Sequence, residues 1–289
     1  MRTGRTTVII PAYNEEDELG GLIKSLQSQT VHPCEVILVD DGSRDRTVER
    51  ASGFFTVLQT SGRRGPAAAR NIGMKQARSD LMAFIDADCR PYPDWIEQIE
   101  MTFSDPHVHV ITGGTWVYSR HFLGQCIAGL GFPGGGALGF TKMWRVAENG
   151  AVSRLSSGNF AMRRQVFLKH GGFDETFDYY CEDAWFAQKL TRSGITIYYI
   201  PEIDVRHAPI ENIFQFVRWH LNRGKGNFVF KQKMGRVGDF VKLRLWSTKN
   251  MVKAYSRNIR LPFMIALLAL SFLCQQIGFL MQKHKAVHS

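Results

Sequence analysis

The sequence is poor in cysteine, and its cysteines are not paired. The 289-residue chain contains five, at Cys34, Cys89, Cys126, Cys181 and Cys274, and no two of them form a CxxC pattern. Their odd number and wide spacing argue against a disulfide framework and a zinc knuckle, and favour a reducing compartment. The N-terminal residues also lack an apolar run long enough for a signal peptide, so we expect the bulk of the protein in the cytosol.

Charged residues make up only 21% of the chain and prolines number 10, whereas 44% of the positions are hydrophobic and 12% are aromatic. This composition excludes a disordered, collagenous or coiled-coil chain, because enough apolar surface is present to offset the entropy of ordering. The length allows one large or two small globular domains.

Acidic residues are scarce in one region. The chain has a formal net charge of +10, and residues 206–260 contain 13 Lys or Arg with only Glu211 and Asp239 as acids. The stretch Asp239–Asn258 mixes apolar and basic residues, which is typical of an interfacial helix that faces anionic headgroups. A solvated basic helix face is the alternative. Nucleic-acid binding ranks last, because no nucleic-acid module accompanies the patch.

The sequence offers a single candidate membrane segment, the uncharged run Leu261–Met281. As a helix this run would be about 31 Å long, which is enough to cross the core of a bilayer. Basic residues flank both ends, and the positive-inside rule favours a cytoplasmic location for the part that precedes it. Because Gln275 and Gln276 interrupt the run, a helix lying against the bilayer or a partner is the alternative. The sequence therefore predicts membrane association through residues 261–289, preceded by a basic interface segment at 227–260.

The first hundred residues alternate strand-like and helix-like runs. The short, continuous apolar runs indicate strands that are buried on both faces, and hence an α/β fold with a mostly parallel sheet between helices. The expected elements are Thr6–Pro11, Glu15–Gln29, Glu35–Asp40, Asp45–Ala51, Phe55–Thr60, Pro66–Ala77 and Leu81–Asp86, followed later by a strand at Asn159–Met162, a helix at Glu182–Arg192 and a strand at Ile195–Ile200. Ligands bind at the carboxyl ends of the strands in such sheets.

The residues that follow these strands are acidic. Glu15, Glu16 and Asp17 occupy the first turn of the first expected helix, with Asn14 as its cap, so an anion would be repelled there. A nucleotide diphosphate would need a cation held on carboxylates. Asp86 and Asp88 follow a buried strand and project to the same side, and their oxygens suit Mg²⁺ or Mn²⁺. A solvated turn is the alternative for this pair.

Several motifs occur in one order along the chain: Val8–Glu15 (VIIPAYNE), Val39–Thr47 (VDDGSRDRT), Ala69–Gly73 (ARNIG), Asp86–Asp88 (DAD), Gly158–Arg164 (GNFAMRR), Gly171–Glu175 (GGFDE) and Glu182–Asp183 (ED). In this order they resemble the family 2 glycosyltransferases of the GT-A fold, which are inverting enzymes that use nucleotide-sugar donors. The resemblance covers roughly Thr6 to Gly226. It implies a catalytic domain at residues 1–226.

The resemblance assigns the nucleotide site. It implies that Pro11, Tyr13 and Glu15 line the nucleoside pocket, that Asp41 contacts the base, and that Arg70 lies near the nucleotide. Each residue also has a purely structural explanation: Pro11 and Tyr13 would merely shape a turn, and Arg70 would be a surface helix residue.

The resemblance also implies a divalent metal ion, Mn²⁺ or Mg²⁺. Asp88 would be its principal ligand, and Asp86 would face the ribose or the ion. His207 follows the last expected strand, at a place where some related enzymes supply another ligand to the metal or the diphosphate. Imidazole fits Mn²⁺ adequately, but a lone histidine is more often structural.

Inverting transfer needs a base that takes the proton of the acceptor hydroxyl. Similarity to the family favours Asp183 for this role, with Glu182 orienting the acceptor or holding the loop. The position at a helix N-terminus tends to keep a carboxylate ionised. The alternative is a plain helix cap.

Gln215, Arg218 and Trp219 match the QxxRW pattern of processive polysaccharide synthases. Such synthases usually carry several membrane segments, and one candidate segment cannot form a polymer channel. If the pattern has the same function here, Arg218 and Trp219 would bind the acceptor. The alternative is that both residues pack in the core or lie at a rim that faces the membrane.

The sequence therefore predicts a membrane-attached glycosyltransferase that moves one sugar from a nucleotide donor to a lipid-linked or cell-envelope glycan acceptor. The rival functions are a processive polysaccharide synthase, a noncatalytic membrane module that binds nucleotide sugars and, remotely, a nucleotidyltransferase.

Overall fold

The computed structural model describes residues 2–177, 180–235 and 238–288. The described chain forms two compact units. The first unit comprises Met1–Thr115, Val146–Asp178 and Asp183–His207, and the second comprises Trp116–Arg145, Tyr179–Glu182 and Ala208–Ser289. The division that the sequence predicts, into 1–226, 227–260 and 261–289, concerns function and stays a prediction.

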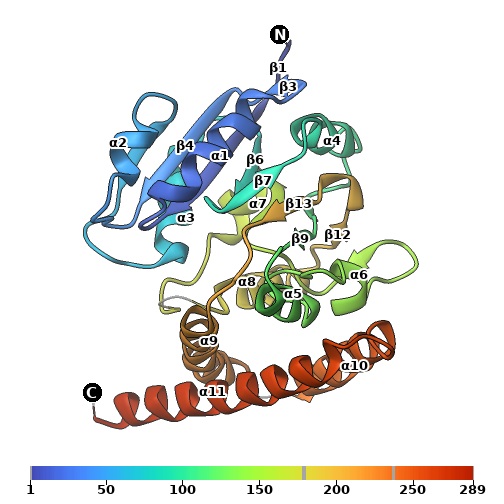
Figure 1. Ribbon diagram of the computed structural model, residues 1–289. Helices are drawn as coiled ribbons and strands as arrows, with labels where there is room; N and C mark the ends of the chain where they lie inside the picture. The colour runs from blue at the N-terminus through green and yellow to red at the C-terminus, as the bar shows by residue number, and fades with distance from the viewer. Residues whose placement is uncertain (1, 178–179, 236–237, 289) are drawn as a thin grey trace. The chain divides into compact units, whose positions relative to one another are not determined.

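The first unit is built on a large mixed sheet (Figure 1). Among the described residues the sheet has eight strands, in the order β10 (Ala151–Val152), β12 (Ile197–Tyr199), β8 (Val110–Thr112), β11 (Asn159–Arg163), β6 (Leu81–Ile85), β2 (Thr6–Ala12), β4 (Glu35–Asp40) and β5 (Thr56–Gln59). Strands β6, β2, β4 and β5 run parallel, and β11 lies antiparallel between β6 and β8. The predicted α/β fold with a mostly parallel sheet is confirmed.

The apolar runs in the sequence become the centre of this sheet. Val8, Ile9 and Ile10 of β2 are fully buried, and the whole of β6 is buried as well. Phe84 of β6 lies opposite Phe160 of β11 in the ladder, and their rings stack with centroids 4.1 Å apart. Burial on both faces explains why these strands lack the alternation of apolar and polar residues.

Helices cover the sheet. They are α1 (Glu16–Gln27), α2 (Thr47–Ala51), α3 (Pro66–Gln76), α4 (Trp95–Thr102), α7 (Arg164–His170) and α8 (Glu182–Arg192), with a short 3₁₀ turn η1 (Pro201–Ile203). The four that the sequence predicts agree with α1, α2, α3 and α8 to within two residues, whereas α4 and α7 are not among the predicted elements. Helix α3 approaches β2 closely at Gly73, where a Cβ would overlap the side chain of Ile9. This contact packs α3 against β2, the strand that leads to Glu15.

The prediction that Asn14 caps α1 is wrong. Glu15 occupies the cap position without a side-chain cap bond, and Asn14 adopts the left-handed conformation with φ 56°. Its side-chain oxygen instead accepts a hydrogen bond of 2.9 Å from the backbone N–H of Arg44. Asn14 therefore joins two loops at the end of the sheet, a use of asparagine that its tolerance of positive φ allows.

A small antiparallel ladder lies beside the main sheet of the first unit. Strand β7 (Cys89–Pro91) follows directly after Asp88, and it pairs with β13 (Val205–His207). The register places His207 opposite Cys89. Two further strands, β1 (Arg2–Thr3) and β3 (Val31–His32), pair with each other, and β9 (Thr115–Val117) leads from the first unit into the second.

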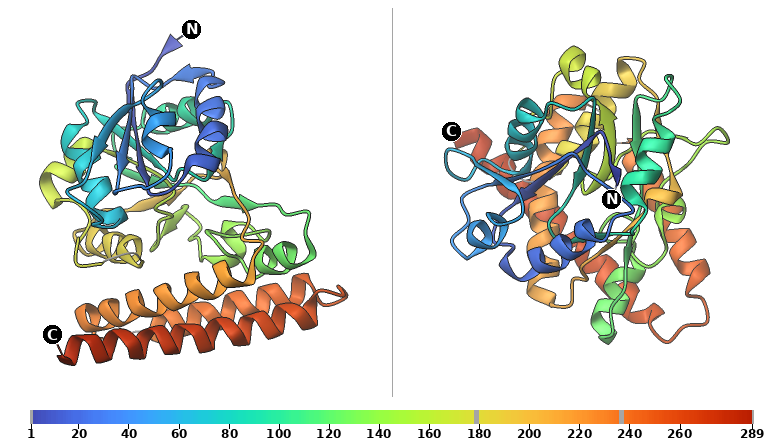
Figure 2. Two further views of the ribbon diagram at one scale, coloured as in Figure 1. Left: turned by 60° about the vertical axis from the view of Figure 1, so that its left-hand side comes forward. Right: turned by 90° about the horizontal axis from the view of Figure 1, so that it is seen from above.

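The second unit is helical: α5 (Phe122–Gly129), α6 (Phe140–Met143), α9 (Ile213–Met234), α10 (Gly238–Ala254) and α11 (Leu261–His288). Figure 2 shows α9, in orange, beside α11, in red. Their backbones approach closely at two glycines, since a Cβ on Gly224 would overlap the backbone of Gln275 and a Cβ on Gly278 would overlap that of Leu221. Glycines thus allow a tight helix pair. The side chains of residues 238–241, at the start of the predicted interfacial stretch, lie outside the described residues.

Helix α11 contains the uncharged run. Within the described part of the chain it is the one helix with the length and composition to cross a membrane, over Leu261–Val287. Only 33% of its apolar 18-residue stretch is buried inside the protein. Many of its large apolar side chains are exposed: Phe263, Ile265, Phe272, Leu273, Ile277, Leu280 and Met281. The helix therefore carries an apolar face that nothing in the described chain covers.

Candidate active site

Acidic side chains gather at the carboxyl ends of β2 and β6, as the sequence predicts. Burial, followed by the negative charges of Asp88 and Asp86, raises the pKa of Glu15 to about 8. Removal from water and nearby like charges each raise the pKa of a carboxyl group. Glu15, Asp86 and Asp88 therefore form one acidic cluster in the first unit.

Asp88 and His207 meet in this cluster because of the β7–β13 ladder. The Nε2 atom of His207 lies 3.3 Å from Oδ2 of Asp88, and both side chains are partly buried. Burial raises the pKa of Asp88, the charge of His207 lowers it, and Asp86 raises it again. The position of His207 beside Asp88 makes it part of the cluster and not an isolated structural histidine.

Cys89 offers a third ligand-type atom at the same place. Atoms of Asp88, Cys89 and His207 lie within 4.8 Å of one another. Burial, with the charges of Asp88 and Asp86, raises the pKa of the Cys89 thiol well above its ordinary value. Cys89 is therefore a neutral thiol, and a neutral thiol is a poor ligand for Mg²⁺ or Mn²⁺.

The donor set fits a hard divalent cation. Carboxylate oxygens and a neutral imidazole are acceptable ligands for Mn²⁺, and carboxylates suit Mg²⁺. Burial is the main cause of the raised pKa values of Glu15 and Asp88, and the neighbouring carboxylates raise both further. A divalent cation on Asp88 and His207 would supply positive charge to the cluster.

Arg70 and Asp86 form a buried ion pair. The Nη2 atom of Arg70 lies 2.7 Å from Oδ1 of Asp86, and the Arg70 side chain is only 2% exposed. Gly158 packs directly against the Asp86 carboxylate, since a Cβ at this glycine would overlap the carboxylate. Asp86 is thus fixed by residues of two other motifs, and Arg70 is not a surface helix residue.

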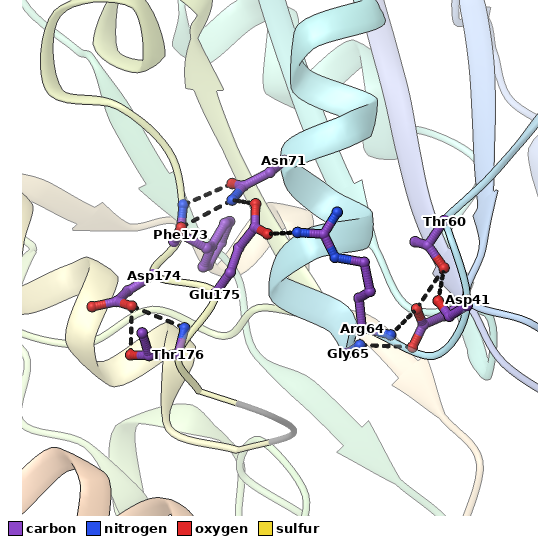
Figure 3. Close-up of polar contacts among 10 residues, drawn as sticks. Asp41, Thr60, Arg64, Gly65, Asn71, Phe173, Asp174, Glu175 and Thr176 are labelled. Carbon is purple, nitrogen blue, oxygen red and sulfur yellow. Dashed lines mark hydrogen bonds and ion pairs between the residues drawn. The ribbon is translucent and has the colours of Figure 1, made fainter.

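Asp41 holds the loop that precedes α3 (Figure 3). Its Oδ1 atom accepts hydrogen bonds from the hydroxyl of Thr60 at 2.8 Å and from the backbone N–H of Arg64 at 2.7 Å. Its Oδ2 atom accepts one from the N–H of Gly65 at 2.8 Å. A carboxylate has about four acceptor sites, so Oδ2 has the capacity for one more donor.

Pro11 and Tyr13 lie near the end of β2, where the sequence predicts the nucleoside pocket. The guanidinium of Arg63 lies 4.2 Å above the centre of the Tyr13 ring. Arg63 belongs to the same loop that Asp41 holds, so Tyr13 and Asp41 face one loop from two strands of the sheet.

Sequence reasoning gave no role to Asn71, which joins the ARNIG and GGFDE motifs (Figure 3). Its side-chain oxygen accepts from the N–H of Phe173 at 2.8 Å, and its amide donates to the carbonyl of Phe173 at 2.9 Å and to Glu175 at 2.8 Å. Glu175 in turn accepts a hydrogen bond of 2.6 Å from Arg64. Asn71 therefore connects the loop at Asp41 to the segment that leads toward α8.

Asn159 supports the strand that carries His207. Its amide donates to the carbonyls of Gly114 and Ile203 at 2.8 and 2.7 Å, and its oxygen accepts a bond of 3.0 Å from the indole of Trp95. Asp204, next to β13, accepts hydrogen bonds from the N–H of Gly114 and the hydroxyl of Tyr199. These buried contacts fix the chain just before His207.

The remaining predicted residues lie at the start of α8 and in the second unit. Asp183 is in the first turn of α8, and its Oδ1 accepts a hydrogen bond of 2.6 Å from the N–H of Ala184. Glu182 is 5% exposed and belongs to the second unit, as do Arg218 and Trp219 of α9. The Trp219 ring packs 5.2 Å from that of Phe132 and 5.8 Å from that of Tyr180.

The sequence profile described as "Glycosyl transferase family 2" matches residues 7–171, more than half of the chain. This chain belongs to glycosyl transferase family 2. Within the matched range lie the acidic cluster at Asp86 and Asp88, the Asp41 loop and Asn71. The predicted resemblance is confirmed.

Two curated relatives illustrate the similarity. The glycosyltransferase AglE of Haloferax volcanii is 36% identical over 115 residues, which are 37% of this chain and 38% of AglE. The pre-mycofactocin glycosyltransferase of Mycobacterium tuberculosis is 29% identical over 212 residues, 70% of this chain and 42% of that protein. The chain thus spans less than half the length of these relatives.

A solved structure supports the fold. The mannosyltransferase PcManGT from Pyrobaculum calidifontis, in complex with GDP-Man and Mn²⁺, superposes with a TM-score of 0.60 at 20% identity, covering 96% of this chain and 84% of that one. With the mixed sheet described above, this likeness confirms the predicted GT-A fold.

Proposed function

We propose that this chain transfers a sugar, with inversion, from a nucleotide-diphosphate donor bound at the carboxyl ends of β2, β4 and β6. The observation that carries the proposal is the acidic cluster of Glu15, Asp86 and Asp88 with His207 beside it. A diphosphate is repelled by such a cluster unless a cation lies between them, and a cation is also what the departing diphosphate needs.

Asp88 and His207 would hold a Mn²⁺ or Mg²⁺ ion. When bound, the ion supplies positive charge to the diphosphate of the donor as the bond to the sugar breaks. Arg70 holds Asp86 through a contact of 2.7 Å, so Asp86 would face the ribose or the ion without moving. The occurrence of Mn²⁺ with GDP-Man in PcManGT supports this arrangement.

The nucleoside would lie against Pro11, Tyr13 and the loop held by Asp41. The unused acceptor site on Oδ2 of Asp41 suits an N–H group of a base. Arg63 and Tyr13 offer flat surfaces on which a base would stack. Glu15, whose pKa is about 8, would hold a proton near neutral pH and could then donate a hydrogen bond to the nucleoside or its phosphates.

Asp183 would act as the base. In the described part of the chain its Oδ2 has no hydrogen-bond partner, whereas Oδ1 is held by the N–H of Ala184. A carboxylate with one fixed and one available oxygen can take the proton of an acceptor hydroxyl. Glu182, the preceding residue, would orient the acceptor.

The acceptor would be lipid-linked or a cell-envelope glycan, and the catalytic domain would lie at the cytoplasmic face of a membrane. The exposed apolar face of α11 and the basic residues of 206–260 support this part of the proposal. Arg218 and Trp219 of α9 would contact the acceptor, since Arg218 is exposed and Trp219 is only partly buried.

The experiment is a measurement of nucleoside-diphosphate release by the detergent-purified protein. UDP-, GDP- and dTDP-sugars are each offered with Mn²⁺, with Mg²⁺ or with a chelator, and total membrane lipid serves as acceptor. The proposal predicts metal-dependent release from one donor. Donor binding without release from any donor would instead indicate a noncatalytic binding module, and a ladder of long products would indicate a processive synthase.

A further inference from the structure

A directed chain of hydrogen bonds runs through the second unit. The thiol of Cys181 donates to Oδ1 of Asn227 at 3.4 Å, and the amide of Asn227 donates to Oε1 of Gln275 at 3.2 Å. The oxygen of Gln275 is therefore an acceptor, so its amide nitrogen must be the donor in the 3.1 Å contact with Nδ1 of His220. This contact explains why a glutamine interrupts the apolar run at position 275.

The chain ends in an unpaired donor. Because Nδ1 of His220 accepts a hydrogen bond, the proton of the neutral ring lies on Nε2. His220 is 0% exposed, and its Nε2 has no hydrogen-bond partner among the residues that the structure describes. An unpaired buried donor is costly, so its presence points to an acceptor that binds there.

Two guanidinium groups lie around the same aromatic rings. The Phe132 ring is 4.9 Å from the His220 ring and 4.5 Å from Cζ of Arg244, and it is also 5.2 Å from the Trp219 ring. Arg223 lies 5.4 Å from the Trp219 ring. His220, Arg223 and Arg244 therefore form one cluster of donors, which we call the α9–α10 donor cluster.

No carboxylate of the described residues neutralises the cluster. In the described part of the chain neither Arg223 nor Arg244 forms an ion pair with a carboxylate, and Nη2 of Arg244 is buried without a partner. Burial, with the charge of Arg223, lowers the pKa of Arg244 to about 10. Burial, with both guanidinium charges, lowers the pKa of His220 to about 3. Two like charges are thus held close together on partly buried side chains.

We propose that the α9–α10 donor cluster binds the phosphate group of a lipid. Guanidinium groups with an additional N–H donor match the oxygens and charge of a phosphate. The lipid part follows from Arg244, which also lies 5.9 Å from the ring of Phe272 on the exposed apolar face of α11. A phosphate bound to Arg244 would have its hydrocarbon chain beside this face.

The phosphate belongs either to a membrane phospholipid or to the acceptor itself, and the second case deepens the proposed function and rests on it. Both sources share the same chemistry, and an experiment can separate them. Binding of the full chain is measured by flotation with vesicles of phosphatidylcholine alone, with added phosphatidylglycerol, or with an added polyprenyl monophosphate. Donor is omitted, so the result does not depend on turnover.

The variants are Arg223→Gln and Arg244→Gln, with Arg120→Gln as the matched control, because Arg120 is an exposed arginine of the same unit and lies outside the basic residues of 206–260. Each cluster variant should weaken binding to vesicles with added phosphatidylglycerol or polyprenyl monophosphate by about tenfold or more, because charge-assisted hydrogen bonds to an anionic lipid phosphate are lost. The control should change binding by no more than about twofold. Weakening with both lipids indicates a headgroup site, whereas weakening confined to polyprenyl monophosphate indicates the acceptor phosphate.

A thermal melt distinguishes this role from a structural one. Removing Arg244 relieves repulsion from Arg223, so Arg244→Gln without lipid should melt no lower than the wild type, and its stabilisation by the lipid should be lost. The proposal is overturned if both cluster variants bind every vesicle as the control does, or if they lose affinity for the nucleotide sugar and not for the lipid.

Discussion

The carboxylate of Asp88 lies 3.3 Å from Nε2 of His207, although Asp88 lies in the turn before β7 and His207 lies far along the sequence in β13. The antiparallel register of β7 and β13 sets this distance, since it places His207 opposite Cys89, the residue after Asp88. The buried bonds of Asn159 and Asp204 fix the chain that enters β13. A pair that is fixed before a ligand arrives is suited to hold a metal ion without rearrangement.

Removal of either ligand should weaken Mn²⁺ binding. Even the loss of a residue that only supports a metal ligand lowers affinity by about 10- to 100-fold, so Asp88→Asn and His207→Ala should each cost at least that much. The measurement is a titration of free Mn²⁺ by electron paramagnetic resonance.

Cys89→Ala is the matched control. The Cys89 thiol lies in the same group of atoms, but its raised pKa keeps it protonated, so the Mn²⁺ affinity of this variant should stay within about twofold of the wild type. If Cys89→Ala binds Mn²⁺ as weakly as Asp88→Asn does, the assignment of the ligands is wrong.

Asn71→Ala should destabilise the protein. The substitution leaves the N–H and carbonyl of Phe173 and the carboxylate of Glu175 without their amide partner, at a cost of about 1–3 kcal/mol. Arg64→Ala removes only a surface ion pair to Glu175 and should cost about 0–1 kcal/mol. Urea unfolding compares the two, and equal costs would show that Asn71 does not hold the GGFDE segment.

Much of this fold can be predicted from the sequence, because the buried parallel strands are continuous apolar runs. Strand β4 agrees residue for residue with Glu35–Asp40, and helix α8 with Glu182–Arg192. Asp86 and Asp88 could be placed for the same reason, since they follow such a run. The prediction that Asn14 caps α1 is wrong because Asn14 accepts a hydrogen bond from Arg44 instead. Arg44 belongs to a second loop, whose position the local sequence does not reveal.

Gln275 and Gln276 should differ in their effect on stability, although they are neighbours in the same apolar helix. Gln275→Ala leaves Nδ1 of His220 and the amide of Asn227 unpaired and should cost about 1–3 kcal/mol. Gln276 is exposed, and Gln276→Ala should stay within about 0.5 kcal/mol. Melting temperatures in detergent test this, and equal shifts would contradict the hydrogen-bond chain.

His220 should make the protein sensitive to acid. Its folded-state pKa of about 3 lies below the ordinary value of about 6.5, so between these values the unfolded chain binds a proton that the folded chain does not. The stability that the neutral ring contributes is complete above about pH 6.5 and falls by about 1.4 kcal/mol for each pH unit below it.

His220→Phe should therefore flatten the dependence of the unfolding free energy on pH in this range. His121→Gln, which changes a histidine that is 72% exposed, should leave the slope unchanged. The same steep slope in both variants would show that another group is responsible.

The parts of the candidate site that the sequence could not give are those made by tertiary contact. Arg223 and Arg244 lie on different helices, α9 and α10. Only the fold brings them to the adjacent rings of Trp219 and Phe132. Asn71 belongs to the ARNIG motif, but the sequence alone assigns it no role, because its partner Phe173 is 102 residues away in the chain.

The central claim is that Asp183 removes the acceptor proton at a donor site built by the acidic cluster. The most direct test compares Asp183→Asn with the wild type in sugar transfer to lipid acceptor and in donor binding by calorimetry. We expect turnover to fall by about a hundredfold to ten-thousandfold while the donor Kd changes by no more than about twofold. Asp105→Asn, at an exposed position, serves as the control. Turnover retained by Asp183→Asn, or donor binding lost in parallel with turnover, would contradict the claim.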